Sequence, residues 1–423
     1  MQGETEAPGT TSGEGPGVTQ VDDQVGAGIE AGAVTGAVDE AGLVSLTSEL
    51  ARFPSHIPDE GELGVFLHEK LVDFGCFDEV RLQPVVPGRF NVIAVLRGRG
   101  GGRNLLLNGH TDVPLPTGRW TRDPYSGAVE DGVVHGVGLT DMKGAIACMA
   151  HAGRALAHSD VDRRGDLVIS AVIHHNVCGL GTRFFLSSWD RPLHAAINGE
   201  PTDLHIQVAH GGAWQFQITT RGRAAHLSRN GVNAITKMVR IVDALTVDRL
   251  TYEPQRMFEG LPRIVVGMIE GGIGPSRTAE RCVAKGDVRL GPGMSEDSLR
   301  ADFGRVVDEL RAADPELVAE IDGLSYQRPF LMDRGAEVVG LVADAHAAVA
   351  AGGAAPPIDD GLPVSSYVTD SSDLVKAGIP TAIYGPGDWR GEPDETIAIA
   401  DLVTATRTYA LAAARFLSAP LPG

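Results

Sequence analysis

The segment 104–116, NLLLNGHTDVPLP, places a short apolar run directly before a group of polar residues. Three consecutive leucines are typical of a strand that is buried on both faces, as in a sheet covered by helices. His110 and Asp112 follow the run, and residues two apart on an extended chain point the same way. This spacing suits a metal-binding imidazole and a carboxylate that orients it. Taken alone, such a pair is more often purely structural than metal-binding.

Two further apolar runs end in the same manner. Residues 167–173 lead into His-His-Asn at 174–176, and residues 195–198 lead through a glycine to Glu200. Ligands of open α/β sheets bind at the carboxyl ends of the strands, so we expect these polar groups to converge on one cleft. Asp141 stands at the start of a predicted helix and would reach the same cleft through a crossover connection. The convergence of several strand ends predicts a functional site.

The pattern of the chain changes in its middle third. The order strand, helix, strand, strand, helix predicts a small α+β unit with helices on one face of its sheet. We therefore predict an α/β catalytic domain in two parts, 39–211 and 326–423, interrupted by an inserted domain at 212–325. Residues 1–38 contain almost no large hydrophobic side chains and are predicted to be disordered or loosely ordered.

Composition argues against several classes of function. The formal net charge of -19 argues against nucleic acids and anionic membranes as partners. The four cysteines are scattered without a Cys-x-x-Cys pair, which predicts neither a disulfide framework nor a thiolate zinc site. No apolar run is long enough to span a bilayer, and no lysine or arginine precedes Arg52, as a secretory signal would require. We expect a cytoplasmic protein.

Seven short motifs are spread along the chain: Gly-His-Thr-Asp-Val-Pro at 109–114, Gly-Leu-Thr-Asp-Met-Lys-Gly at 138–144, Gly-Glu-Pro-Thr at 199–202, Gly-Arg-Ala-Ala-His at 222–226, Gly-Val-Asn-Ala-Ile at 231–235, Asp-Val-Arg at 287–289 and Tyr-Gly-Pro-Gly at 384–387. Together they resemble the zinc-dependent aminoacylase and carboxypeptidase-type amidohydrolases, which include acetylornithine deacetylase, succinyl-diaminopimelate desuccinylase and the glutamate carboxypeptidases. The resemblance implies a zinc-exopeptidase-like domain with a mostly parallel central sheet flanked by helices. It also implies that the insert is an α+β lid and dimerisation domain.

The resemblance further implies two zinc-like ions bridged by one aspartate. His110, Asp141 and Glu200 match the ligands of the first ion, with Asp141 as the bridge. Asp112 matches the carboxylate that orients the metal-bound histidine. His226 matches a histidine that, in dimeric relatives, reaches the partner's site and stabilises the oxyanion.

The same resemblance names candidates for substrate binding. Arg289 matches an arginine of the insert that can hold a substrate carboxylate. Asn233, in one of the matching motifs, and Asn176, in the predicted cleft, are the other candidates. The family's lid also implies a homodimer.

The sequence departs from the family at the centre of the site. His175 replaces the glutamate that serves as general base, Asn176 replaces a ligand of the second metal, and Gly391 replaces another. A neutral amide and a glycine cannot take the place of a carboxylate and an imidazole, so the second site should be empty or very weak. The first site keeps one imidazole and two carboxylates, which suit one divalent ion, with zinc favoured, or none.

Two residues near this centre have alternative interpretations. His175 is a replacement acid/base, a new metal ligand together with His174, or a product of drift without a role. Asp370 precedes Ser371 and Ser372 and is interpreted as a helix cap rather than a cleft contact.

These observations favour an enzyme that acts on an amide or acyl group of a small amino-acid-derived substrate, with His175 as acid/base and His226 on the oxyanion. Because a site without its water-activating base can keep an acyl group from water, we expect condensing, cyclising or acyl-transfer chemistry. One alternative is an ordinary N-acyl amino acid or dipeptide hydrolase that uses one metal. The other is a non-catalytic pseudoenzyme that binds a carboxylated small molecule through Arg289.

Overall fold

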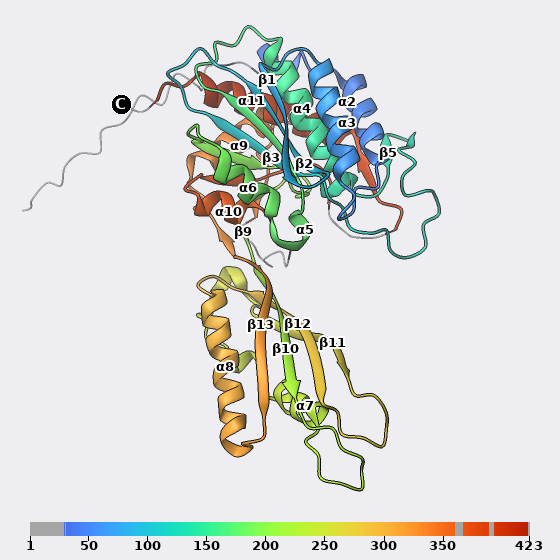
Figure 1. Cartoon of the computed structure of the whole chain (residues 1–423). Coiled ribbons are helices and arrows are strands. Elements are labelled where there is room, and N and C mark those ends of the chain that lie inside the picture. The colour runs from blue at the N-terminus through green and yellow to red at the C-terminus, as the bar shows by residue number, and fades with distance from the viewer. Residues whose placement is uncertain (1–28, 30, 360–366, 389–392, 422–423) are drawn as a thin grey trace, which may run out of the picture.

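The computed structural model describes residues 29, 31–359, 367–388 and 393–421. Within these ranges the chain forms a large lobe built on an eight-stranded sheet and a smaller lobe built on a four-stranded sheet (Figure 1). Gly391 and most of the predicted tail lie outside the described residues. The described end of that tail is not loose, because Val34 in helix α1 (Gly32–Thr35) is fully buried in the main core.

The eight-stranded sheet supplies the framework of the large lobe. Its strands, in spatial order, are β1 (Glu79–Val86), β2 (Arg89–Leu96), β6 (Leu167–Val172), β3 (Leu105–His110), β7 (Ala195–Asn198), β16 (Thr381–Ile383), β8 (Ile206–Gln207) and β15 (Ile358–Asp359). Four of the seven described pairings are parallel, and they include the central run from β6 to β16. The predicted mostly parallel α/β sheet is therefore confirmed.

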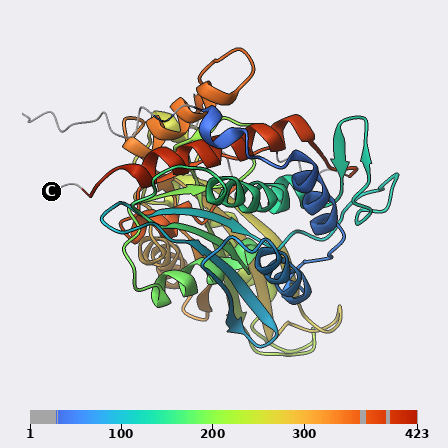
Figure 2. The same cartoon turned by 90° about the horizontal axis from the view of Figure 1, so that it is seen from above.

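Helices cover both faces of this sheet. Leu105 and Leu107 of β3 face a core formed with α2 (Glu40–Ala51), α3 (Gly61–Asp73), α4 (Gly144–Ala157), α9 (Glu337–Val349) and α11 (Ile399–Ser418). Leu106 faces the opposite way, toward Phe185 of α6 (Leu180–Ser188) and Leu374 of α10 (Ser371–Lys376). Figure 2 shows α4 and α11 side by side across the first face. A strand buried on both faces explains the continuous leucine run.

The smaller lobe is an antiparallel sheet in the order β11 (Arg263–Gly271), β12 (Arg281–Leu290), β10 (Gly212–Arg221) and β13 (Val318–Gln327). Helices α7 (Ala234–Ala244) and α8 (Glu296–Ala313) pack on one face, where Trp214, Phe216 and Phe303 form an aromatic cluster. The other face bears alternating polar residues such as Gln215 and Asp287. The large-lobe end of this polar face forms the lid side of the site described below.

Small elements complete the described chain: β4 (Val129–Glu130), β5 (Val133–His135) and β17 (Thr396–Ala398) in one sheet, β9 (Ala209–His210) and β14 (Phe330–Leu331) in another, and the short turns η2 (Val247–Arg249) and η3 (Arg256–Phe258). Strands β9 and β14 pair next to the two segments that connect the lobes. A search of the described helices finds none with the length and apolar character that a bilayer crossing requires.

Candidate active site

Three neighbouring parallel strands deliver the central residues of the site. Strand β3 ends at His110, the chain beyond β6 turns into α5 (His175–Cys178), and Glu200 follows β7 by two residues. Asp141 comes from the irregular turn η1 (Leu139–Lys143), immediately before α4. His110, His175 and Glu200 are buried, and the side chain of Asp141 is 15% exposed. The predicted convergence of strand ends is present in the structure.

His110, Asp141 and Glu200 form a compact donor set. His110 Nε2 lies 3.1 Å from Asp141 Oδ1 and 3.8 Å from Glu200 Oε2. Burial alone would lower the pKa of His110, but the Asp141 carboxylate raises it well above its ordinary value. Glu200 Oε1 is buried and has no hydrogen-bond partner among the described residues. A buried carboxylate oxygen without a partner is costly, so this set fits a divalent cation held by one imidazole and two carboxylates.

The orientation of His110 differs from the prediction. Its Nδ1 lies 2.9 Å from the main-chain oxygen of Asp112, which assigns the proton to Nδ1 and leaves Nε2 for a cation. The Asp112 carboxylate is 4.0 Å away and accepts the main-chain N–H groups of His175 and Asn176, each at 2.8 Å. Asp112 therefore orients His110 through its backbone, while its carboxylate fixes the loop after β6.

Asn176 is held by the same carboxylate. Its Nδ2 donates to Asp112 Oδ2 at 2.9 Å, so the side chain folds back on the loop that carries it. Asn176 nevertheless borders the cavity between the lobes, where the substrate-binding role was predicted. Asn176 is thus tied to Asp112, and as an amide it cannot supply a carboxylate ligand to the second metal site.

His175 is fixed at both ring nitrogens. Nδ1 lies 3.0 Å from Asp370 Oδ1, and Nε2 lies 3.1 Å from the main-chain oxygen of Val368. Burial alone would lower the pKa of His175, but the Asp370 carboxylate raises it to about 9. With both nitrogens facing acceptors, His175 is arranged as a proton donor, and this geometry does not favour a base near neutral pH.

The side chain of Asp370 is buried against the cleft residue His175, so its interpretation as a helix cap was wrong. It stands at the N-terminus of α10, but its side chain makes no capping hydrogen bond. Oδ1 contacts His175, and Oδ2 accepts from Thr182 Oγ1 at 2.7 Å. Despite burial, the positive charge at His175 lowers the pKa of Asp370 to about 2, so Asp370 is a carboxylate.

The geometry of His175 does not suit a metal ligand of the first site. Ligand atoms of His110, His175 and Glu200 lie within 4.8 Å of one another. However, the two imidazole rings are stacked, with centroids 4.2 Å apart and planes at 8°. Nitrogen lone pairs lie in the ring planes, so two parallel rings do not direct both lone pairs at one ion. His174 is not in this group, and its Nδ1 lies 3.6 Å from Cys178 Sγ.

A cavity of about 360 Å³ joins this centre to the lid. Asp141, His175 and Glu200 line one wall, and Arg289 lines the other with Asp287. Arg289 Nε lies 2.9 Å from Asp287 Oδ1, and burial raises the pKa of Asp287. The lid wall is completed by residues that sequence reasoning missed: Gln215, Arg263, Ser325 and Gln327. Only the strand register reveals them, because it places them on the face that carries Arg289.

Two predicted site residues lie in the lid, away from both this cavity and the donor set. His226 is exposed in a loop of the lid, where its Nδ1 lies 3.0 Å from Ser228 Oγ. Asn233 caps helix α7, since its Oδ1 accepts from the main-chain N–H of Ile235 at 3.1 Å and of Ala279 at 3.2 Å. The side-chain oxygen of Asn233 thus holds the lid together, and its substrate-binding role stays a prediction. Whether His226 reaches a partner's cleft stays a prediction.

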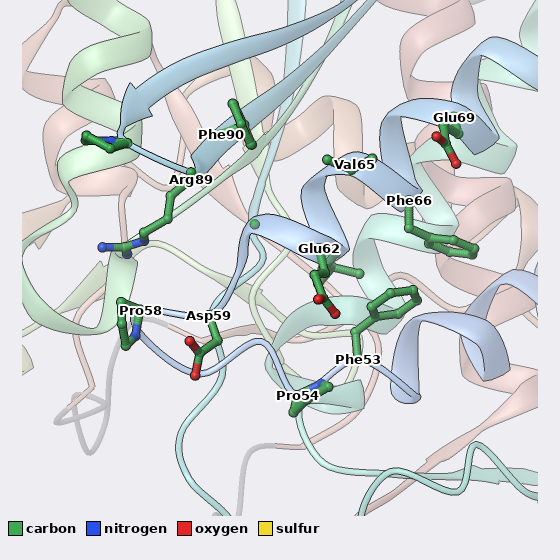
Figure 3. A pocket seen from close by; sticks show the side chains of 14 residues that line it. Phe53, Pro54, Pro58, Asp59, Glu62, Val65, Phe66, Glu69, Arg89 and Phe90 are labelled. Carbon is green, nitrogen blue, oxygen red and sulfur yellow. The ribbon is translucent and has the colours of Figure 1, made fainter.

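A larger hollow of about 840 Å³ lies on the outside of the large lobe (Figure 3). Phe66 borders it from α3, Phe53 borders it from the loop before α3, and Arg89 borders it from the start of β2. Arg89 is paired with the buried carboxylate of Glu60. None of the candidate site residues lines this hollow, so size alone does not mark the functional cavity.

Comparisons with known proteins agree with this architecture. The profile of Peptidase family M20/M25/M40 matches residues 106–415. An acetylornithine deacetylase from Photorhabdus laumondii is 30% identical over 339 residues, which cover 75% of this chain and 81% of the relative. The N-formyl-4-amino-5-aminomethyl-2-methylpyrimidine deformylase of Bacillus subtilis is 31% identical over 359 residues, 76% of this chain and 82% of the relative. The solved structure of the di-peptidase Dug1p from Saccharomyces cerevisiae superposes with a TM-score of 0.73 at 12% identity, covering 92% of this chain and 99% of that one.

Proposed function

The chain belongs to peptidase family M20/M25/M40, and on this basis we propose an enzyme that acts on an amide or acyl group of a small amino-acid-derived substrate with one cation site instead of two. The observation that carries the proposal is the donor set of His110, Asp141 and Glu200, with a buried oxygen on Glu200 that accepts no hydrogen bond from the described residues. In the second site only Asp141 keeps a suitable donor, because Asn176 and Gly391 replace the other ligands.

Residues of the large lobe and residues of the lid have different proposed roles in the cleft. A divalent ion at His110, Asp141 and Glu200 would polarise the carbonyl of the substrate. Arg289, oriented by Asp287, would hold a carboxylate of the substrate from the lid. His175, whose two ring nitrogens are held by Asp370 and by the main-chain oxygen of Val368, would place a positive charge on the wall beside the first site. Together these groups can bind and polarise an acyl compound between the lobes.

The residue that stands in place of the family's water-activating glutamate supports chemistry other than simple hydrolysis. His175 stands there, and both of its ring nitrogens are hydrogen-bonded to acceptors. Loss of a positioned general base typically slows a reaction by about 10²–10⁴-fold. We therefore propose acyl transfer, condensation or cyclisation, in which an amine or another nucleophile, rather than water, attacks the acyl carbon. The bond from this carbon to its original amine, or to a hydroxyl group in a condensation, then breaks, and the leaving group departs with the proton of the nucleophile as free amine or water.

The test is a product analysis with purified protein. N-acyl amino acids and dipeptides are incubated with and without Zn²⁺, in water alone and with an added amine, and the products are identified by mass spectrometry. The proposal expects amide exchange or cyclisation to exceed hydrolysis. Rapid zinc-dependent hydrolysis with no transfer product would overturn it. Absence of any turnover, with retained binding of carboxylates, would favour the pseudoenzyme.

An ordinary hydrolase with one metal is the second candidate. It is favoured by the complete first-site donor set and by relatives named as a deacetylase and a deformylase. In this case the attack by water would be slow unless another group accepts its proton. Zinc-dependent release of free acid and amine, unaffected by added amine, would support this candidate over transfer.

We also propose that two copies associate through the lid. Strand β11 lies at the edge of its sheet and exposes Val265, Met268 and Ile269 by 55–63%. Leu227 and Ile273, in the loops at the same end of the lid, are 81% and 87% exposed. An exposed apolar edge strand is a template for pairing with another chain. Such a dimer would also give His226 access to a partner.

A further inference from the structure

Two arginines reach the cleft from neighbouring strands of the lid. Arg263, the first residue of β11, is paired in register with Arg289 of β12, so both side chains leave the same face of the sheet. Both line the cavity that contains Asp141 and Glu200. Like charges directly opposite each other destabilise an antiparallel pair, so this arrangement favours an anion nearby.

The protein supplies only part of that negative charge. Asp287 contacts Nε of Arg289 at 2.9 Å. Arg263 Nε instead donates to the main-chain oxygen of Gly260 at 3.0 Å, and no carboxylate of the described chain lies within 4.0 Å of its guanidinium. Among the described residues that line the cavity, the lid wall thus has two cations and one anion, in a chain whose net charge is -19. The local excess of positive charge runs against the charge of the whole protein.

We propose that Arg263 is a second carboxylate-binding residue beside Arg289, and that the substrate is an N-acyl derivative of an acidic amino acid. This inference rests on the proposed function and specifies its substrate class. Cross-strand neighbours have Cβ atoms about 4.5–5.5 Å apart, so two guanidinium groups can each bind one carboxylate of the same residue. The acyl group then extends toward Asp141 and Glu200 on the opposite wall.

The test compares two ligands of equal size that differ by one charge. N-methanesulfonyl-L-glutamate and N-methanesulfonyl-L-glutamine carry a sulfonyl group in place of the acyl carbonyl, so they bind without turnover. Isothermal titration calorimetry with the full chain should give a dissociation constant about 10-fold lower for the glutamate compound, as for a charge-assisted hydrogen bond. In Arg263→Gln the ratio should fall to about 2 or less, with unchanged binding of the glutamine compound.

Two further variants separate charge from structure. Arg263→Lys keeps the charge without the planar fork and should retain an intermediate preference. Arg281→Gln removes an exposed arginine at the other end of the lid sheet and should keep the full preference. Thermal melting monitored by circular dichroism verifies that each variant is folded.

The outcomes distinguish this inference from the proposed function. Equal binding of both ligands by the unaltered protein, no binding of the glutamate compound, or equal weakening of both in Arg263→Gln would overturn the inference. A preference for the dianion without any reaction of N-acetyl-L-glutamate or N-acetyl-L-glutamine leaves the inference standing and contradicts the enzyme. Reaction of both N-acetyl compounds without a preference for the dianion would support the enzyme and overturn the inference.

Discussion

The imidazole rings of His110 and His175 are stacked, with centroids 4.2 Å apart and planes at 8°. Each ring is anchored at Nδ1, His110 by the main chain of Asp112 and His175 by the carboxylate of Asp370. These contacts hold the rings in parallel planes, so the two neighbouring histidines have different partners and different proposed roles. His110 presents a nitrogen to Asp141 and Glu200, whereas both nitrogens of His175 are used by Asp370 and by the main-chain oxygen of Val368.

Metal analysis should find about one zinc ion for each chain. His110→Ala and Glu200→Gln each remove a donor of the first site and should reduce the retained metal to a few per cent, measured by plasma mass spectrometry after dialysis. His175→Ala should keep the ion, because the stacked ring is not assigned as a ligand. Asn176→Ala serves as a second control. Two tightly held ions in the unaltered protein would contradict the single-site proposal.

The convergence at the centre of the site could be predicted because it depends on local patterns. The apolar runs before His110 and Glu200 fix where strands end, and parallel neighbours bring those ends together. The change of pattern in the lid could be recognised for a similar reason, because alternation of apolar and polar residues along a strand indicates a sheet with one covered face and one solvent-exposed face. These signals need no knowledge of distant contacts.

Other features depend on contacts that no local pattern encodes. Asp370 meets His175 across 195 residues of sequence, and nothing in its neighbourhood distinguishes this contact from a helix cap. Arg263 joins Arg289 through the register of β11 and β12, which the sequence does not specify. The cap at Asn233 was not predicted, because an asparagine before a helix caps it as readily as it binds a substrate.

Removing Asp370 should destabilise the large lobe. Asp370→Ala leaves the buried His175 ring and the Thr182 hydroxyl without their acceptor. Breaking a buried ion pair by deleting one partner typically costs about 3–5 kcal/mol. Urea unfolding at neutral pH measures the change in the free energy of unfolding. Asp373→Ala removes a carboxylate from an ion pair with the half-exposed Arg183, so its effect should stay below about 1 kcal/mol. Equal effects of the two variants would contradict the structural role of Asp370.

Stability should fall as the solution becomes acidic, in part because of His151. Its ring is 2% exposed and packs edge-on against Phe74, and burial lowers its pKa to about 4. A histidine whose pKa is lowered by folding binds fewer protons in the folded state. It therefore contributes full stability above its unfolded pKa of about 6.5 and loses this contribution as the pH falls toward 4.

The matched variant is His151→Leu, which cannot be protonated. Between pH 7.5 and pH 5, the unaltered protein should lose on the order of 1–2 kcal/mol more unfolding free energy than His151→Leu, measured by urea titration at both values. Some acid sensitivity should remain in the variant, because buried His210 also has a pKa lowered to about 4. The same pH dependence in both proteins would show that His151 does not contribute.

Light scattering should find a particle of about twice 44.4 kDa. Met268→Lys places a charge on the exposed edge strand β11 and should shift the mass to that of one chain, because a lysine on an edge strand disfavours pairing. Val318→Lys alters β13 at the opposite edge of the same sheet, where the valine is 48% exposed, and should remain dimeric. A measured mass of one chain for the unaltered protein would contradict association through the lid.

Glu395 should control metal affinity without touching the metal. Its carboxylate accepts the main-chain N–H groups of Gly138 at 2.9 Å and Thr140 at 2.7 Å, and also the Thr140 hydroxyl at 2.7 Å. These bonds hold the turn that carries Asp141, so Glu395→Gln, which turns an amide group toward the N–H donors, should loosen that turn. Mutation of groups that support ligands typically weakens metal binding by about 10–100-fold. Competition with a chromogenic zinc chelator measures this change, and Asp394→Asn, at a carboxylate that binds the Thr121 N–H on the adjacent loop, should have little effect.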